Sequence, residues 1–493
     1  MADAWQVDPA DNVATLLRNV VSGEAIALAA APPVTAAADI ARGHKIALAP
    51  IAEGAAVIKF GFPIGRARRA ISPGDHVHSD NLATALAGTL DYRPGTTRSA
   101  AAVVASDASF DGYLRADGRV GTRNEIWVLP TVGCVARTAR RIAARAHARY
   151  VGMVDGVHAL VHPFGCSQLG DDLAGTRRIL AALARHPNAG GVLIIGLGCE
   201  SNQLETLLAE VPKARRGAIR TMIAQTSPDE IAEGEALVDQ LVAQAAQPRV
   251  PVGLDKLVLG VKCGGSDGFS GLTANPLVGR MSDRIAKAGG KVILTEIPEI
   301  FGAEQLLMAR AASADVFDRI GTMVNDFKRY FLAHGEPVSE NPSPGNIAGG
   351  ITTLEEKSLG AVQKGGSAAV VDAIGYGAQA TVPGLTLLEA PGNDAVSSTA
   401  LAAAGATMIL FTTGRGTPLG APVPTLKIAS NSALAAAKPG WIDFDAGMAL
   451  ADGMEISADA LLARILAIAS GEETAAERND EREMAIWKRG VTL

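Results

Sequence analysis

The chain has 493 residues, a net charge of -6 and a pI near 5.8. This length exceeds what one hydrophobic core organises and indicates two to four domains. Hydrophobic residues make up 48% and charged residues 19%, which excludes a disordered chain, and the lack of long Lys/Arg runs excludes a typical nucleic-acid-binding surface.

The first residues, MADAWQVDPADN, are acidic and lack the positively charged start of a secretory signal. We find no apolar stretch near the roughly 18 residues that a membrane helix needs. Four cysteines in so long a chain do not indicate a disulfide scaffold. We therefore expect a cytoplasmic protein that binds neither membranes nor nucleic acids, with its cysteines as free thiols or metal ligands.

Residues 1–92 are predicted to form a small, mostly β module. Short β-like runs bounded by turn residues occur at Asn12–Leu17, Ala25–Ala29, His44–Leu48, Val57–Phe60 and Asp75–His78. Residues 93–108, which are rich in Ala and Ser, are predicted to be a linker between two differently patterned parts of the chain.

From residue 109 onward, apolar runs alternate with helical segments. In residues 109–248 we expect strands at Ile126–Pro130, His158–His162 and Val192–Ile195, and helices at Arg137–Arg149, Asp172–Arg185 and Pro228–Gln244. In residues 249–493 we expect strands at Leu257–Val261, Val292–Thr295, Ala368–Asp372, Leu385–Glu389 and Met408–Thr412. This alternation predicts an α/β fold with two regions of mainly parallel sheet, the first of them Rossmann-like.

Each cysteine follows an apolar, strand-like run. The segments IWVLPTVGC, ALVHPFGC, GVLIIGLGC and LVLGVKC end at Cys134, Cys166, Cys199 and Cys263. Because ligands bind outside the carboxyl ends of parallel strands, we predict that the four thiols face one site and that at least three approach one metal. Thiolates suit iron, iron–sulfur clusters or zinc. The alternative is that each cysteine is buried as a small hydrophobic residue.

Five of the eight histidines fall in two compact motifs. His44, His76 and His78 belong to the N-terminal module, whereas His158 and His162 precede Cys166. Imidazole serves as an iron ligand or as a general base near neutral pH. An isolated histidine is more often a hydrogen-bonded structural group, so the residues alone leave both roles open.

Polar, glycine-rich loops occupy Cys263–Pro276, Glu340–Ser358, Ala390–Ala400 and Thr412–Gly420. Such loops suit a small hydroxylated anion, although ordinary turns use the same residues. The candidate contacts are Ser266, Asp267, Asn346, Asn393 and Asp394, with Arg415 or Lys427 for a carboxylate. Neither GxxxxGK[ST] nor a complete dinucleotide fingerprint is present. Glu296, Glu299 and Glu304 are further candidates to bind metal or move protons, unless they are solvated acids at a helix start.

Several of these segments resemble the altronate/galactarate dehydratase family. They are DGRVGTRNE, HPFGCSQLGDD, GLGCESNQ, CGGSDGFSGLTANP, TEIPEIFGAEQLL, PGNDAVSSTAL and LFTTGRGTP. The N-terminal GHKIAL, VIKFGFPIG and ISPGDHVHSDNL resemble the SAF-type β module of the same family. The resemblance runs almost from end to end. One departure is Ile347, which stands where the family pattern PGNKAGG has Lys, and we expect it to be peripheral.

The resemblance implies an iron-dependent hydro-lyase that removes water from C2–C3 of a sugar acid. The length, the HPNAG segment at His186 and the terminal GVTL are closer to members acting on D-altronate, with 2-dehydro-3-deoxy-D-gluconate as product. The candidates for taking the C2 proton are His44, Lys45, Lys59 and His162. Iron is expected as Fe(2+), either as a single ion or in an iron–sulfur cluster, and the enzyme is expected to be a homo-oligomer.

Two alternatives remain at this stage. One is a galactarate dehydratase, and the other is a sugar-acid-binding protein without catalysis. The presence of all four cysteines and both histidine motifs favours an enzyme. A sulfolactate-type lyase is disfavoured because this chain fuses both modules.

Overall fold

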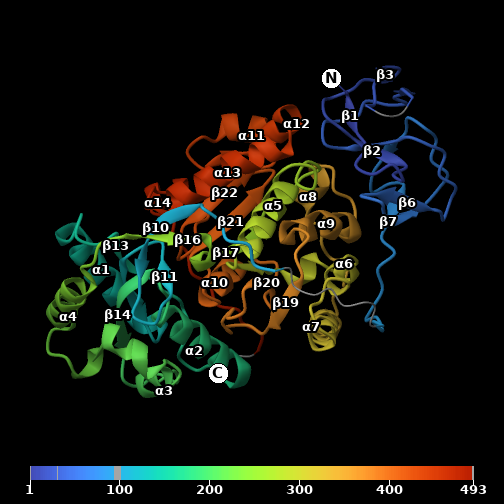
Figure 1. Ribbon diagram of the computed structural model, residues 1–493. Coiled ribbons are helices and arrows are strands. Elements are labelled where there is room, and N and C mark those ends of the chain that lie inside the picture. The colour runs from blue at the N-terminus through green and yellow to red at the C-terminus, as the bar shows by residue number, and fades with distance from the viewer. Residues whose placement is uncertain (1, 30–31, 94–101, 491–493) are drawn as a thin grey trace.

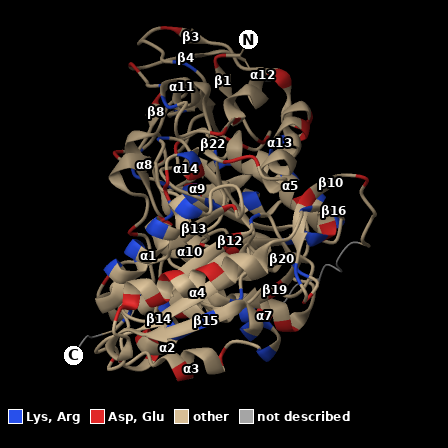
Figure 2. Cartoon of the chain, turned by 90° about the vertical axis from the view of Figure 1, so that its left-hand side faces the viewer, with Lys and Arg blue, Asp and Glu red and all other residues tan. Residues whose placement is uncertain are grey.

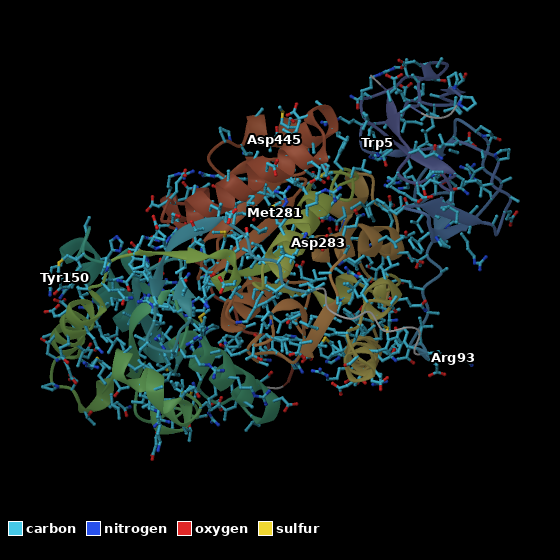
Figure 3. The ribbon with its side chains drawn as sticks, viewed as in Figure 1. Trp5, Arg93, Tyr150, Met281, Asp283 and Asp445 are labelled. Atoms are coloured by element: carbon cyan, nitrogen blue, oxygen red, sulfur yellow. The ribbon has the colours of Figure 1, made fainter. Side chains whose placement is uncertain are left out.

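Three regions follow one another along the chain in the computed structural model, which describes residues 2–29, 32–93 and 102–490. The N-terminal region and the second region lie on opposite sides of the C-terminal region (Figure 1). In Figure 3, Trp5 and Tyr150 mark these two sides, and Met281 lies in the region between them. None of the helices in the described residues is long and apolar enough to cross a membrane.

The N-terminal region is built from short strands, as predicted. One antiparallel sheet has the order β1 (Ala4–Trp5), β2 (Val13–Leu16), β5 (Lys45–Ala47) and β8 (His76–Val77). A second contains β6 (Ala56–Lys59), β7 (Phe62–Ala67) and β9 (Leu82–Ala83), and β3 (Ala25–Ile26) pairs with β4 (Val34–Thr35). Tight turns keep the strands short. Gly74, for example, has φ +90°, and a Cβ there would lie 1.9 Å from the Thr35 carbonyl oxygen.

The second region contains a parallel sheet of order β13 (Gly156–Ala159), β12 (Glu125–Pro130), β14 (Ala189–Gly196) and β15 (Ile219–Ile223). Alternate residues of β12 serve opposite faces. Ile126 and Val128 join a core with α1 (Ala136–Arg149) and α4 (Glu230–Ala245), whereas Trp127 and Leu129 join one with α2 (Gly170–Ala184) and α3 (Leu204–Ala209).

Two details of the second region differ from or extend the predictions. Strand β13 ends at Ala159 and does not reach His162, because the ring of His162 binds the backbone at Pro130 and Phe164 and so anchors a turn. The arginine-rich face of α1 is exposed, as predicted, and it pairs with acids of α4. Arg149 lies 2.6 Å from Glu235, and Figure 2 shows basic segments of α1 beside acidic segments of α4.

The C-terminal region is formed around seven parallel strands, which confirms the predicted α/β class. Their order is β19 (Val370–Ile374), β20 (Gly384–Leu388), β18 (Lys291–Leu294), β17 (Val258–Cys263), β21 (Met408–Thr413), β22 (Thr425–Ala429) and β23 (Phe444–Asp445). The α-helices are α5 (Ala274–Lys287), α6 (Glu304–Met308), α7 (Ala314–Ala333), α8 (Pro344–Ala348), α9 (Leu354–Ala361), α10 (Asp394–Ala403), α11 (Ser432–Ala437), α12 (Ala449–Asp452), α13 (Met454–Ala469) and α14 (Ala475–Arg478). Helices α5 and α10 contribute to separate cores, and α10 packs against α2 of the second region.

A small antiparallel sheet joins the regions. Strand β10 (Ser109–Leu114) pairs with β11 (Val120–Gly121) on one side and with β16 (Val250–Gly253) on the other. Of the predicted linker, residues 102–108 form neither helix nor strand, and residues 94–101 lie outside the described residues. The predicted domain boundary at residues 248–249 falls just before β16.

Two buried lysines hold the N-terminal region on the C-terminal region. The ammonium groups of Lys45 and Lys59 each lie 2.8 Å from a carboxylate oxygen of Glu356 on α9, and Lys45 also donates to the Gly350 carbonyl oxygen at 2.7 Å. Burial alone would raise the pKa of Glu356, but the two ammonium groups outweigh it and hold that pKa well below its usual range. Glu356 therefore stays ionised and links both regions.

We predict that Glu356→Gln loosens the N-terminal region, because two buried ammonium groups lose their shared counter-ion. Breaking a buried ion pair from one side costs about 3–5 kcal/mol. The thermal midpoint should fall, and limited proteolysis should release an N-terminal fragment faster. The control is Asp80→Asn, whose partner Arg69 is exposed and should matter little. Equal effects of both variants would contradict this role for Glu356.

Candidate functional site

The candidate site lies at the carboxyl edge of the seven-stranded sheet. Strand β17 comes first in the chain, β18 is added on one side of it, and β21 is added on the other. The order of the sheet therefore reverses at β17, and ligands of open α/β sheets bind at such a point. Cys263 is the last residue of β17, and Glu296 and Arg415 follow β18 and β21 at this edge.

A buried network of ion pairs occupies the base of the site. The Lys262 ammonium lies 2.9 Å from Glu296 and 2.6 Å from Asp394 at the start of α10. Lys357 of α9 lies 2.8 Å from Glu299. The Cys263 Sγ lies 3.2 Å from Glu299 Oε2. Buried charges require such partners, so the network fixes the relative positions of β17, α9 and α10.

Burial and neighbouring charges shift the pKa values of the three acidic groups in different directions. Burial raises the pKa of the Cys263 thiol to about 12, so it is protonated near neutral pH. For Glu299, burial opposes ionisation, but Lys357 and Lys364 outweigh it and lower its pKa. For Glu296, burial outweighs the attraction of Lys262 and raises the pKa. The site therefore combines a neutral thiol with at least one carboxylate that remains ionised.

Within the described residues, one group of acidic or sulfur donors is close enough to hold an ion in common. Ligand atoms of Cys263, Glu296 and Glu299 all lie within 4.8 Å of one another. Thiolate and carboxylate donors are compatible with iron. Each donor, however, already has a lysine beside it, and Lys364 Nζ lies 2.8 Å from the Cys263 Sγ. These ammonium groups compete with a cation for the same donor atoms, because Glu296 and Glu299 are already paired with lysines.

The serine, aspartate and asparagine predicted to contact substrate are buried around the CGGSDGFSG loop. The Asn346 amide donates to the Ser266 carbonyl oxygen at 2.8 Å, and its oxygen accepts from Lys357 at 3.1 Å. The Asp267 carboxylate is used within the protein. It accepts hydrogen bonds from Phe269 N, Ser270 N, Ser270 Oγ, Ser430 Oγ and Asn431 Nδ2.

Arg415 differs from the other candidate contacts because it is exposed and its guanidinium has no hydrogen bond or ion pair within the described residues. A Cβ added at Gly345 of α8 would lie 3.6 Å from its Nε, so the side chain extends towards α8. Asn393 instead caps α10 by accepting from Val396 N at 3.1 Å. Lys427 is buried and donates to the Thr417 and Pro418 carbonyl oxygens. Arg415 is therefore the better partner for a ligand carboxylate.

Three histidines of the N-terminal region lie over α8. The rings of His44, His76 and His78 have centroids 5.0–5.1 Å apart, and His44 Nδ1 lies 3.0 Å from His76 Nε2. His78 Nε2 lies 3.1 Å from the Ile347 carbonyl oxygen. This contact uses the backbone of Ile347 and so does not depend on the side chain that replaces the family's Lys. Burial lowers the pKa of His44, and it lowers the pKa of His76 to about 4.

The other base candidates are His162, Lys45 and Lys59, and the side-chain nitrogens of each already have partners within the protein. His162 is buried with Nε2 at 2.9 Å from the Pro130 carbonyl oxygen and Nδ1 accepting from Phe164 N. Burial lowers the pKa of Lys45 to about 8, which would suit a base, but its ammonium is enclosed with Glu356 and Gly350. Lys59 is likewise held by Glu356. His44 differs from the other three in being half-buried, although its Nδ1 lies 3.0 Å from His76 Nε2 and its Nε2 lies 3.4 Å from the Ala348 carbonyl oxygen.

The cysteines divide into two groups. Cys134, Cys166 and Cys199 follow adjacent strands of the second region, and all three are exposed. Cys263 is the last residue of β17 in the other sheet and is buried. The four cysteines therefore belong to two separate parallel sheets, and their convergence on one site stays a prediction. Ligation of a common ion by at least three of them stays a prediction.

Sequence reasoning missed the three lysines at the base of the site. Lys262, Lys357 and Lys364 are all buried, with at most 8% of each residue exposed. Their letters lie in or next to the recognisable segments GVKCGG, TTLEEKS and VQKGG. The sequence signal for Lys262 is its position directly before Cys263 at the end of an apolar run. Because that run is predicted to be a buried strand, a lysine within it is expected to be buried too.

Comparisons with known proteins agree along the whole chain. Three family models match: the altronate/galactarate dehydratase SAF domain at residues 2–85, the D-galactarate dehydratase/altronate hydrolase second domain at 112–246, and the D-galactarate/altronate dehydratase C-terminal domain at 254–492. The chain is 50% identical to an altronate dehydratase of Escherichia coli and 46% identical to one of Bacillus subtilis, each over 98% of both chains. It is 33% identical to the galactarate dehydratase (L-threo-forming) of Escherichia coli over 88% of this chain and 87% of that one.

Proposed function

The chain belongs to the altronate/galactarate dehydratase family and is a sugar-acid hydro-lyase, and we propose that it converts D-altronate to 2-dehydro-3-deoxy-D-gluconate and water. The greater identity to the two altronate dehydratases supports altronate over galactarate. The proposal rests mainly on the residues at the point where the strand order reverses. There the ion pairs Lys262–Glu296 and Lys357–Glu299 are buried, and the guanidinium of Arg415 has no partner within the described residues.

The residues at this edge suggest how a sugar acid is held. We assign its carboxylate to Arg415, whose guanidinium can form two parallel hydrogen bonds to it. Ser266, Asn346 and Asp394 supply polar groups for the hydroxyls of the sugar chain. Asp267 and Asn393 are positioning residues, because their side chains hold loop or helix backbone in place.

Dehydration requires loss of the C2 proton and departure of the C3 hydroxyl. His44 is the proposed base, since burial keeps its imidazole neutral at neutral pH and its ring lies at the edge of α8. As the proton leaves, negative charge builds on the substrate carboxylate and C2. The ammonium groups of Lys262 and Lys357 stabilise this negative charge. The protonated Cys263 thiol donates a proton to the leaving hydroxyl.

Iron is assigned to the second region. Cys134, Cys166 and Cys199 are thiols at three neighbouring strand ends, and none has an ion pair with lysine within the described residues. Exposed thiols are poorly explained as core residues, and three thiolates would suit iron or an iron–sulfur cluster. Their sulfur atoms are not all within 4.8 Å of one another, however, a spacing that within the described residues is met by Cys263, Glu296 and Glu299. When bound, iron would supply Lewis acidity to a hydroxyl or carboxylate oxygen. Helix α2, which begins just after Cys166, packs on α10, which begins at Asp394.

Assembly as a homo-oligomer and a cytoplasmic location remain predictions from the sequence. The domain limits 1–92, 109–248 and 249–493 likewise stay proposals. The main sheets of the three regions are separate, which supports them, but the small sheet β11–β10–β16 spans the limit at 248–249.

The substrate assignment predicts a preference of at least about 100-fold in kcat/KM for D-altronate over galactarate, because a site that hydrogen-bonds hydroxyls rejects mismatched stereochemistry strongly. The assay measures formation of the 2-keto acid anaerobically with Fe(II) and a reductant. Preference for galactarate would overturn the substrate. Saturable binding without any turnover would instead indicate a sugar-acid-binding protein.

The iron assignment predicts that Cys166→Ser loses bound iron, while Cys263→Ser retains it. Mutating a residue that hydrogen-bonds to a metal ligand typically lowers metal affinity by about 10- to 100-fold. Removing the ligand itself should lower the affinity for iron by at least as much. Iron content is measured by elemental analysis, and visible absorption reports whether a cluster is present. If Cys263→Ser loses the iron and Cys166→Ser keeps it, the ion belongs with Glu296 and Glu299.

The base assignment predicts that His44→Ala lowers kcat by about 10²- to 10⁴-fold, the usual contribution of a general base. Because the pKa of His44 is lowered, the wild-type rate should fall only as the pH drops below the ordinary imidazole value of about 6.5. The residual rate of the variant should lose that acidic limb. The control is exposed His334→Ala. An unchanged pH profile in His44→Ala would exclude His44 as the base.

A further inference from the structure

A second cavity lies at the opposite edge of the seven-stranded sheet. It has a volume of about 300 Å³, and its walls include Val258 and Lys291 at the amino ends of β17 and β18. Pro187 and the β10–β11 turn of the second region close its other side. The cavity therefore lies between two regions, and it is separated from the candidate active site by the length of the strands.

Three basic side chains and one acidic side chain line this cavity. They are Arg119, Lys256 and Lys291, and the acid is Asp255, which lies 3.0 Å from the Lys256 ammonium. Arg119 belongs to the DGRVGTRNE segment, for which the dehydration chemistry gives no role. It is oriented by Asp117 and the Arg185 carbonyl oxygen, which bind its Nε and Nη2. Its Nη1 has no hydrogen bond within the described residues.

Lys291 is the cation of this cavity that has no counter-ion within the described residues. Its ammonium is half-buried and has neither an ion pair nor a hydrogen bond within the described residues. Burial lowers its pKa, and the positive charges of Arg119 and Lys256 lower it further. Burial lowers the pKa of Arg185 as well, and the charge of Arg119 lowers it further. Cations that destabilise one another around a cavity become favourable when an anion enters it.

We propose that this cavity binds a small phosphorylated metabolite, whose dianionic phosphate is held by Arg119 and Lys291. A guanidinium fork beside an ammonium group matches a phosphate. The volume leaves room for a body of about sugar size next to Gln379 and Thr381. Because Arg119 comes from the second region and Lys291 from the C-terminal sheet, the bound anion would tie the two regions together. This gives the site a regulatory character distinct from catalysis.

Isothermal titration calorimetry on the full-length, iron-loaded protein tests the proposal, with glucose 6-phosphate as the probe. We expect one saturable site per chain that neutral glucose does not occupy. Lys291→Met, which keeps the apolar stem, should weaken binding at least about tenfold, since a charge-assisted hydrogen bond is lost. Lys256→Met, at an exposed position, should weaken it less. Exposed Lys213→Met is the matched control and should bind normally.

Two further ligands distinguish the sources of the anion. Inorganic sulfate, a tetrahedral dianion, should compete with the probe, and malonate, a dicarboxylate, should compete poorly. Malonate that binds as tightly as glucose 6-phosphate, with the same loss in Lys291→Met, would overturn the phosphate assignment. The site itself would be overturned if glucose 6-phosphate showed no saturable binding. It would also be overturned if Lys291→Met kept the wild-type thermal midpoint and bound the probe as tightly as the wild type.

Discussion

A charged lysine can be buried only if partners in the protein replace its water, and a carboxylate is the strongest such partner. Around the candidate active site this constraint applies repeatedly. Lys262 requires Glu296 and Asp394, Lys357 requires Glu299, and the pair of lysines from the N-terminal region requires Glu356. Each pair joins elements that are distant in the sequence. The ion pairs that compensate for the burial of these lysines therefore also align the strands, α9, α10 and the N-terminal region around the carboxyl edge of the sheet.

The N-terminal region has two roles that follow from these contacts. Lys45 and Lys59 fix it against α9, while His44 and its neighbours lie over α8 a short distance along the same surface. The residues that attach the region are consequently different from the residue proposed to act on substrate. This separation explains how a small β module without a large core can place an imidazole reliably, because buried ion pairs set its orientation.

The two edges of the C-terminal sheet have different electrostatics. At the carboxyl edge, lysines are matched by carboxylates, and an exposed arginine is available for an acidic substrate. At the amino edge, Lys291 has no counter-charge within the part of the chain that the structure describes, and Arg119 lines the same cavity. The cysteines are divided in a comparable way. Cys263 is enclosed in the lysine network, whereas Cys134, Cys166 and Cys199 are exposed in another sheet.

The sequence by itself determined the fold class and most strand positions, because buried parallel strands are continuous apolar runs, as in Val192–Ile195 and Met408–Thr412. It also determined the family, through long motifs that are matched residue by residue. The tertiary structure alone decided that the cysteines divide between two sheets and that His162 binds backbone. It also decided which lysines are buried with carboxylates. The physical reason is that apolar periodicity is a local property, whereas the pairing of charges and the assignment of strands to sheets depend on contacts between residues far apart in the chain.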